Sequence, residues 1–138
     1  MYEFKIITSM VIQDKDGRFL LGKRSMDEDV FPGLWSIPGG KVEHGPEELD
    51  VLEKNVQKEV LEEFGIGVEV EKYVQSHSDG KGKIYIIFSG RMTEGIPTAL
   101  EDTDKVEWFR LSDIDEKVLC PRVYEILKKA DLNKLNST

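Results

Sequence analysis

Cysteine is almost absent from this chain, since Cys120 is the single one among 138 residues. One cysteine excludes an intrachain disulfide, which fits a reducing compartment, and we expect the protein to be cytoplasmic. Histidine is nearly as scarce, and His44 and His77 have no Cys or His partner at zinc-site spacing. The sequence therefore predicts neither a disulfide framework nor a zinc centre.

Long apolar runs and an excess of positive charge are also missing. No apolar stretch is long enough to span a bilayer, and Glu3 and Lys5 interrupt the N-terminal one, which favours a strand over a signal peptide. Lys and Arg number 19 against 27 Asp and Glu, which gives a net charge of -8. This charge opposes binding to a nucleic-acid polymer or an anionic membrane, because both are negative. An anionic small molecule would need a metal ion to bring it in.

The length and the 39% hydrophobic content indicate one domain spanning residues 1–138. Apolar runs separated by turn residues predict strands, and apolar residues at helical spacing predict helices. We expect strands at 4–13 and 19–21 joined as a hairpin, a short strand at 34–37, a hairpin of 68–76 with 84–88, and a strand at 106–111. Helices are expected to start near Pro46, ending at Gly65, and near Ser112, and to cover 122–130.

The most informative segment is a pair of glycines followed by a helix rich in carboxylates. Gly39 and Gly40 predict a tight turn, and Glu59, Glu62 and Glu63 fall within about 100° of helix surface. Neighbouring carboxylates repel one another, and Mg²⁺ prefers oxygen ligands, so a divalent cation between them would resolve the repulsion. The alternative is a solvated acidic face. Against it, Glu59 and Glu63 border the predicted apolar stripe, where desolvation is costly without a partner; the stripe comprises Leu49, Leu52, Val56, Val60 and Phe64.

This segment resembles the signature of the Nudix hydrolases, Gly, five residues, Glu, seven residues, Arg-Glu-apolar-any-Glu-Glu-any-Gly-apolar. The second half matches closely at residues 58–66, with Lys58 in place of arginine. The first half departs from the pattern, because Asp50 replaces glutamate and Gly40 lies four residues too far from it. Residues 44–49 therefore make a loop longer by about one helical turn. The flanking segments 22–24, 34–38 and 106–109 also resemble the family.

The resemblance implies an α/β fold, a Nudix-type α/β/α sandwich with a mixed sheet between helices. It also implies a site for Mg²⁺, with Mn²⁺ possible, held by Glu59, Glu62, Glu63 and the carbonyl of Gly39. Lys58 would orient carboxylates as the family's arginine does, although an ordinary ion pair with Glu62 explains it equally well. Family members carry a further acid late in the chain, for which we favour Glu101 over Asp102, with a solvated loop as the alternative.

Two cations are candidates for contacts with substrate phosphates. Arg24 and Lys41 would each supply positive charge near the glycine pair, and for either one a solvated surface cation is the alternative.

The implied function is a metal-dependent pyrophosphohydrolase acting on a small nucleotide, for which we favour cleavage of a (deoxy)nucleoside triphosphate to monophosphate and pyrophosphate. ADP-ribose or nucleotide-sugar pyrophosphatases share the same segment and stay open as alternatives. A non-catalytic nucleotide sensor is a third reading, motivated by Lys58, Asp50 and the long loop, but the intact Glu59, Glu62 and Glu63 argue against it. The sequence leaves both a monomer and a homodimer open.

Overall fold

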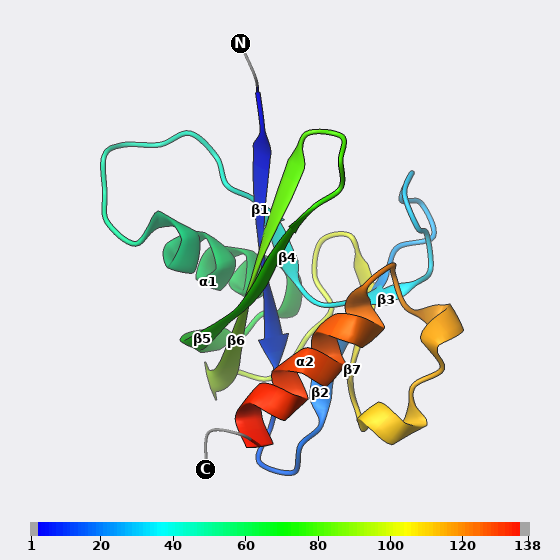
Figure 1. The fold of residues 1–138 in the computed structure, drawn as a ribbon. Coiled ribbons are helices and arrows are strands. Elements are labelled where there is room, and N and C mark those ends of the chain that lie inside the picture. The colour runs from blue at the N-terminus through cyan, green and yellow to red at the C-terminus, as the bar shows by residue number, and fades with distance from the viewer. Residues whose placement is uncertain (1–2, 136–138) are drawn as a thin grey trace.

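The computed structural model describes residues 3–135, which form two β-sheets with a helix on either side (Figure 1). Within these residues no helix is both long and apolar enough to cross a membrane. The elements are β1 (Lys5–Ile12), β2 (Phe19–Arg24), β3 (Trp35–Ser36), β4 (Gly39–Lys41), α1 (Val51–Phe64), β5 (Gly67–Ser78), β6 (Lys83–Glu94), β7 (Thr103–Phe109), two 3-10 turns (Leu111–Asp113 and Glu116–Val118) and α2 (Val123–Leu135).

The strands are divided between a four-stranded sheet in the order β4-β1-β6-β5 and a three-stranded sheet in the order β3-β2-β7. β1 and β6 run parallel, whereas the other pairs are antiparallel, so the expected mixed pairing is confirmed. The predicted hairpin of the first two strands is wrong, because β4 and β6 occupy both edges of β1. β2 therefore enters the other sheet, and only a bridge between Gln13 and Phe19 links the two strands.

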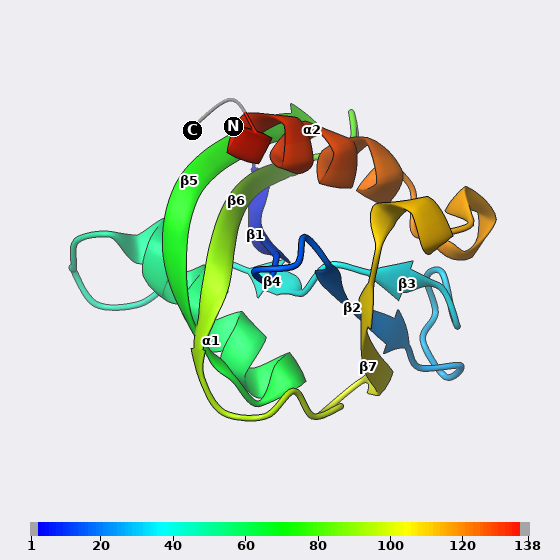
Figure 2. The same ribbon diagram turned by 90° about the horizontal axis from the view of Figure 1, so that it is seen from below.

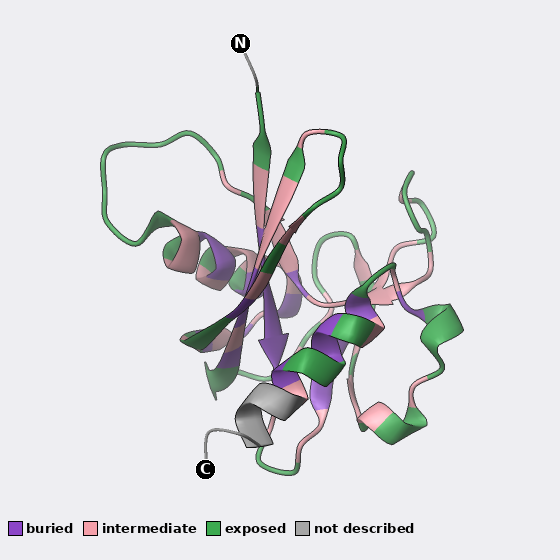
Figure 3. Ribbon diagram, in the orientation of Figure 1, coloured by how far each residue is buried: buried purple, intermediate pink, exposed green. Residues whose placement is uncertain are grey.

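The two helices cover opposite faces of the strands, which confirms the α/β/α sandwich (Figure 2). Side chains alternate along β1, so Met10 and Ile12 pack in the cluster under α1 while Val11 packs in the cluster under α2. Val56, Val60 and Phe64 supply the buried face of α1 (Figure 3). The site described below is thus carried by a helix anchored in the main core.

The start of α1 differs from the prediction. The helix begins at Val51, preceded by Asp50 with a left-handed φ of 57° and no side-chain capping bond, so Pro46 does not start it. Leu49 is 81% exposed and does not belong to the apolar stripe. Residues 43–50 instead form an exposed loop that projects beside α1 (Figure 1). The extra residues lengthen this loop and not the helix; the predicted helix end at Gly65 is confirmed.

The C-terminal part also departs from expectation in detail. The helix predicted to start near Ser112 is replaced by two 3-10 turns, each of three residues. α2 runs to Leu135, beyond the predicted end at Ala130. Val123, Ile126 and Leu127, which the helical spacing placed in the core, are buried, and so is Ala130.

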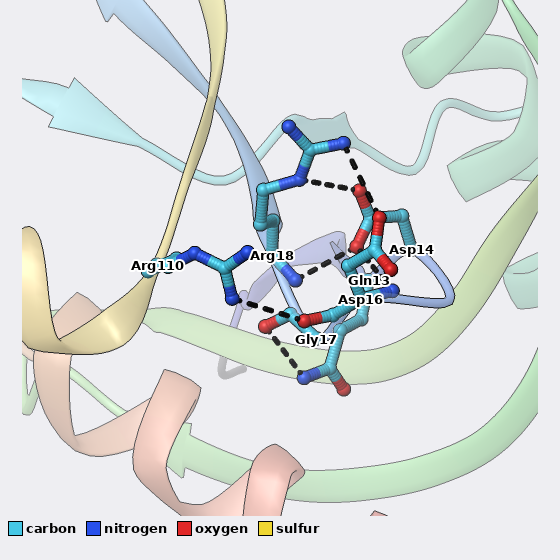
Figure 4. A network of polar contacts seen from close by, with 6 residues as sticks. All are labelled: Gln13, Asp14, Asp16, Gly17, Arg18 and Arg110. Carbon is cyan, nitrogen blue, oxygen red and sulfur yellow. Dashed lines mark hydrogen bonds and ion pairs between the residues drawn. The ribbon is translucent and has the colours of Figure 1, made fainter.

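A polar network holds the turn between β1 and β2, where the chain passes from one sheet to the other (Figure 4). The Asp14 carboxylate accepts hydrogen bonds from the backbone N–H groups of Asp16 and Arg18 at 3.0 and 2.8 Å and from Arg18 Nε at 2.8 Å. Gln13 donates to the Gly17 carbonyl and to Asp131 on α2. Burial raises the pKa of Asp14, but the bonds from Arg18 outweigh it, so the pKa lies below its ordinary value.

We expect Asp14→Ala to lower the free energy of unfolding by about 1–3 kcal/mol, because three donors lose their acceptor. A carboxyl with a depressed folded-state pKa stabilises the protein above its unfolded pKa of 3.8, and this stability disappears as pH falls through the lower folded-state value. The difference between wild type and variant in urea denaturation should therefore shrink below pH 4. Asp16→Ala is the control, since the Asp16 side chain is 69% exposed and its carboxylate comes no closer than 3.9 Å to the Arg18 guanidinium. Equal losses in both variants would contradict the role of Asp14.

Candidate active site

The carboxylates of α1 lie directly against the glycines of β4. A Cβ on Gly40 would collide with the Glu59 carboxyl group, and one on Gly39 would collide with the Thr8 carbonyl and Ser9. Both glycines lie in β4, and neither has a positive φ, so the predicted glycine turn is wrong. Glycine is needed here because the helix and its neighbouring strand approach the backbone so closely.

Glu63 is the most perturbed acid of the site. Its Oε2 accepts a hydrogen bond from the Gly39 N–H at 3.2 Å. The pKa of Glu63 is raised to about 8, mainly by burial and to a smaller extent by Glu59 and Glu101, while the hydrogen bond from Gly39 and the charge of Arg24 act in the opposite direction. An isolated carboxylate here is unfavourable at neutral pH, and a nearby cation would reverse that.

Glu59 belongs to the same electrostatic cluster. Burial raises its pKa, repulsion from Glu62 raises it further, and Lys58 partly opposes the shift. Glu62 is partly exposed on the next turn of the helix. Glu62 thus acts electrostatically on Glu59, and Glu59 acts on Glu63.

Glu101 is brought to this cluster by two backbone contacts. The Leu100 N–H bonds to the carbonyl of Glu63 at 3.0 Å, and the Ser25 N–H bonds to the carbonyl of Asp102 at 2.9 Å. The segment between these bonds is fixed to the end of α1 on one side and to the loop after β2 on the other. Glu101 raises the pKa of both Glu59 and Glu63, which places its charge beside theirs.

Four acids surround a pocket next to these carboxylates, which we call the acidic pocket: Glu28, Glu63, Glu101 and Asp102. Lys23 and Arg24 also line it. Its donor set is made of carboxylate oxygens, the chemistry that Mg²⁺ favours. Within residues 3–135, however, no three Asp, Glu, His or Cys side chains are already grouped to hold a metal ion.

A larger groove, which we call the long cleft, continues from the acidic pocket and has a volume of about 620 Å³. The two share Arg24, Ser36, Ile37 and Gly39. The long cleft lies between the β1 and β6 strands, the loop after β2 and the start of α2, and its lining includes Ile7, Phe31, His77, Tyr85 and Arg122. Apolar walls with a few charged groups are typical of a site for a small molecule.

The predicted cations occupy different places. Arg24 lies at the junction of the acidic pocket and the long cleft, where its Nε donates to the Val30 carbonyl at 3.0 Å and its Nη2 lies 3.5 Å from Glu28 Oε2. Lys41 is exposed on β4 and lines neither cavity. Lys58 lines a third cavity, beneath residues 42–48, and forms no ion pair with Glu62 within 4.0 Å.

Sequence reasoning missed two residues of this region. Asn55 is buried on α1 and donates from Nδ2 to the Gly40 carbonyl at 3.2 Å and to Thr8 Oγ1 at 2.9 Å, which ties the helix to both strands. Its position one helical turn before Glu59 was the available signal. Glu28 sits in a polar loop whose sequence has no periodicity, so nothing marked it out.

Strained backbone is found around these cavities. Among residues 3–135, four residues other than glycine have left-handed φ values between 50 and 69°, namely Phe31, Asp50, Glu101 and Arg122. Phe31 and Arg122 line the long cleft, Glu101 lines the acidic pocket, and Asp50 precedes α1 at the end of the long loop. Such conformations cost about 1–3 kcal/mol each and cluster at functional sites.

Known proteins share both this sequence pattern and this fold. Nucleoside triphosphatase NudI of Klebsiella pneumoniae is 28% identical over 120 residues, covering 80% of this chain and 84% of that protein. A MutT NUDIX hydrolase from Burkholderia pseudomallei superposes with a TM-score of 0.71 at 27% identity, over 92% of this chain and 98% of that one. A NUDIX hydrolase from Nitrosomonas europaea superposes with a TM-score of 0.85 at 18% identity, and the match covers 100% of this chain and 76% of that one. The family model of the NUDIX domain matches residues 3–130, and the chain therefore belongs to the NUDIX family.

Proposed function

We propose that this protein is a metal-dependent pyrophosphohydrolase that cleaves a (deoxy)nucleoside triphosphate to monophosphate and pyrophosphate. The observation that carries the proposal is the junction of the acidic pocket with the long cleft at Gly39 and Arg24. Carboxylates at one end suit a metal and diphosphate, and the long cleft has room for the nucleoside. Membership of the NUDIX family and the similarity to nucleoside triphosphatase NudI support this choice.

The residues present fit a divalent metal. Glu59, Glu62, Glu63 and the Gly39 carbonyl would hold Mg²⁺ or Mn²⁺, and the raised pKa values of Glu59 and Glu63 express how much this cluster favours a cation. Because the carboxylates are not grouped in advance, they must turn toward one another when the ion enters. Bound metal would neutralise charge on the diphosphate and lower the pKa of the attacking water.

The chain's own groups would then perform separate tasks. The Gly39 N–H orients Glu63, and Asn55 fixes the adjacent Gly40 carbonyl. Glu101, held beside Glu63 by the Leu100 bond, accepts the proton of the attacking water as the phosphoric anhydride bond breaks. Arg24 supplies positive charge to a phosphate at the junction, and Lys58 orients the carboxylates. Lys41 would reach phosphate only from outside the described cavities.

The proposed substrate is a small molecule, and the protein would act in the cytoplasm, as expected from its single cysteine. A screen of nucleoside triphosphates, ADP-ribose and nucleotide sugars with Mg²⁺ and with Mn²⁺, scored by phosphate released after coupling, tests the assignment. Turnover of triphosphates to monophosphate and pyrophosphate is expected. Preference for ADP-ribose would replace the substrate assignment, and binding without turnover of any compound would instead favour the sensor.

We expect Glu59→Gln and Glu62→Gln each to lower kcat by at least ~10²-fold, because each removes a charge that holds the metal. Excess EDTA should abolish wild-type turnover. Glu53→Gln is the matched control, since Glu53 lies on the same helix but is not among the charges that shift the pKa of Glu59 or Glu63. Steady-state kinetics on folded variants decide the point, and near wild-type rates in both would refute the ligand assignment.

Metal binding should depend on pH through Glu63. With a folded-state pKa of about 8, the carboxyl is mostly protonated at pH 7, so we expect about one proton to be released per ion bound, and apparent affinity to rise toward pH 8. Calorimetry in buffers of different ionisation enthalpy measures the release. Without metal, the folded state retains a proton that the unfolded state loses above 4.5, so Tm should fall between pH 4.5 and 8. Glu63→Gln should lose both effects; an unchanged proton release in that variant would contradict the assignment.

The role of Lys58 can be separated from simple surface charge. If Lys58 orients carboxylates, Lys58→Ala should lower kcat well beyond any change in stability, and Lys58→Arg should keep or raise it, because a guanidinium holds two carboxylate oxygens at once. Lys54→Ala provides the control, since Lys54 is also exposed on α1 but pairs with Glu48 at 3.2 Å. Comparing kcat with Tm for the three variants tests this, and a normal kcat in Lys58→Ala would refute the orienting role.

A further inference from the structure

The long cleft is positively charged although the protein is strongly acidic. Four cations line it, Arg24, Lys81, Lys83 and Arg122, against one carboxylate, Asp79. The whole chain has a net charge of -8, and the adjoining acidic pocket is lined by four acids. The long cleft is therefore a positively charged surface on a protein whose net charge is negative.

Two of these cations lie away from the carboxylates of α1, since Lys83 begins β6 and Lys81 is in the turn before it. Gly39 pairs with Ser9, and Ser9 pairs with Ile87 on β6. Lys83 lies four residues from Ile87 along β6, a separation of about 13 Å at the usual rise of a strand. Tyr85 lies between them, facing His77 on β5. The cationic end is thus beyond the reach of a diphosphate bound at the carboxylates and within the length of a bound nucleotide.

The acids near these cations leave the positive charge available. Asp79 uses Oδ1 to accept the backbone N–H groups of Lys81 and Lys83 at 2.7 and 3.0 Å, and these bonds lower its pKa. Within residues 3–135 neither lysine ammonium lies within 4.0 Å of a carboxylate. Arg122 pairs with Glu125 at 3.5 Å, but both side chains are more than half exposed, so that pair is weak and can yield to a ligand.

An uncharged aromatic surface adjoins the cations. His77 and Tyr85 stack with ring centroids 4.9 Å apart and planes 13° from parallel. Burial lowers the pKa of His77, and Arg122 lowers it further, so the imidazole is neutral at pH 7. A flat ring could pack in this part of the cleft, but a neutral base and ribose would not require the three cations around it.

We propose that the long cleft binds a nucleotide carrying a second phosphoryl group on its ribose, held by Lys83 and Arg122 with Lys81. The inference rests on the proposed function for the placement of the reacting diphosphate, and it refines the substrate class. Phosphate at this position would make charge-assisted hydrogen bonds to groups from two elements, the β5–β6 turn and the start of α2. The left-handed φ of 69° at Arg122 fixes the residue at the cleft at a cost in backbone energy.

The experiment compares ligands that cannot be hydrolysed at an anhydride bond. Adenosine 5′-monophosphate, adenosine 3′,5′-bisphosphate and adenosine 2′,5′-bisphosphate are titrated into the full-length protein with Mg²⁺ at 0.1 M salt. We expect at least one bisphosphate to bind about tenfold or more tightly than the monophosphate, as one added charge-assisted contact provides. In Lys83→Gln and Arg122→Gln this ratio should fall to about threefold or less, while affinity for the monophosphate stays within about twofold.

Lys72→Gln is the control, because Lys72 is an exposed lysine on β5 that does not line the cleft, and it should keep the wild-type ratio. Thermal melts verify that each variant is folded. Equal binding of mono- and bisphosphates by the wild type would overturn the proposal, as would no binding of any of them. Equal losses for all ligands in the variants would also overturn it. Since no ligand is turned over, absence of hydrolysis in the substrate screen would refute the proposed function without affecting this result.

Discussion

Close approach of α1 to the backbone of β4 is the constraint on which the site depends. The helix is fixed by Val56, Val60 and Phe64 in the core, so Glu59 fits against the strand only because no Cβ projects from Gly40, while Gly39 lacks a Cβ that would collide with β1. At this close approach Glu63 accepts a hydrogen bond from the Gly39 N–H, and Asn55 donates one to the Gly40 carbonyl. The same approach also buries Glu63 and places it beside other acids, which raises its pKa. The tight packing of α1 against β4 and the raised pKa of Glu63 therefore have the same structural cause.

The two sheets place the acidic pocket beside α1 and the positively charged long cleft next to that pocket. The acidic pocket is bounded by α1, by β2 and by the segment before β7, whereas the long cleft is bounded by β1, β6 and the start of α2. Arg24 stands where the two meet. A ligand spanning both would meet carboxylates in the acidic pocket and cations in the long cleft. A single flat sheet could not offer both surfaces to one molecule.

Local patterns predicted much of the fold and of the helix that carries the site. The spacing of Val56, Val60 and Phe64 indicated the buried face, and the intervals between Glu59, Glu62 and Glu63 indicated their common arc. Long-range geometry was beyond such patterns. The strand formed by Gly39 and Gly40 depends on what approaches from α1, and the separation of β1 from β2 depends on strands that come later in the chain. Leu49 looked like a core residue until the helix was found to begin after it.

Similarly, Lys83 and Arg122 of the long cleft are nearly forty residues apart in the sequence, so only the fold brings them to the same cavity. The place of Glu101 follows from a backbone bond between Leu100 and Glu63. The position of Glu101 in the chain was enough to make it a candidate, whereas its contacts could not be predicted from the sequence. Roles for these side chains stay predictions until the variants are measured.

The strained backbone at Phe31, Asp50, Glu101 and Arg122 has a consequence for protein engineering. Glycine adopts these dihedral angles without steric cost, so a stabilisation program that ranks substitutions by backbone energy would select these four positions. Three of them line the cavities, and the fourth ends the long loop. Stabilised variants obtained in that way would lose side chains that line the cavities. For this fold, the positions where glycine would most relieve backbone strain are those that a library should leave untouched.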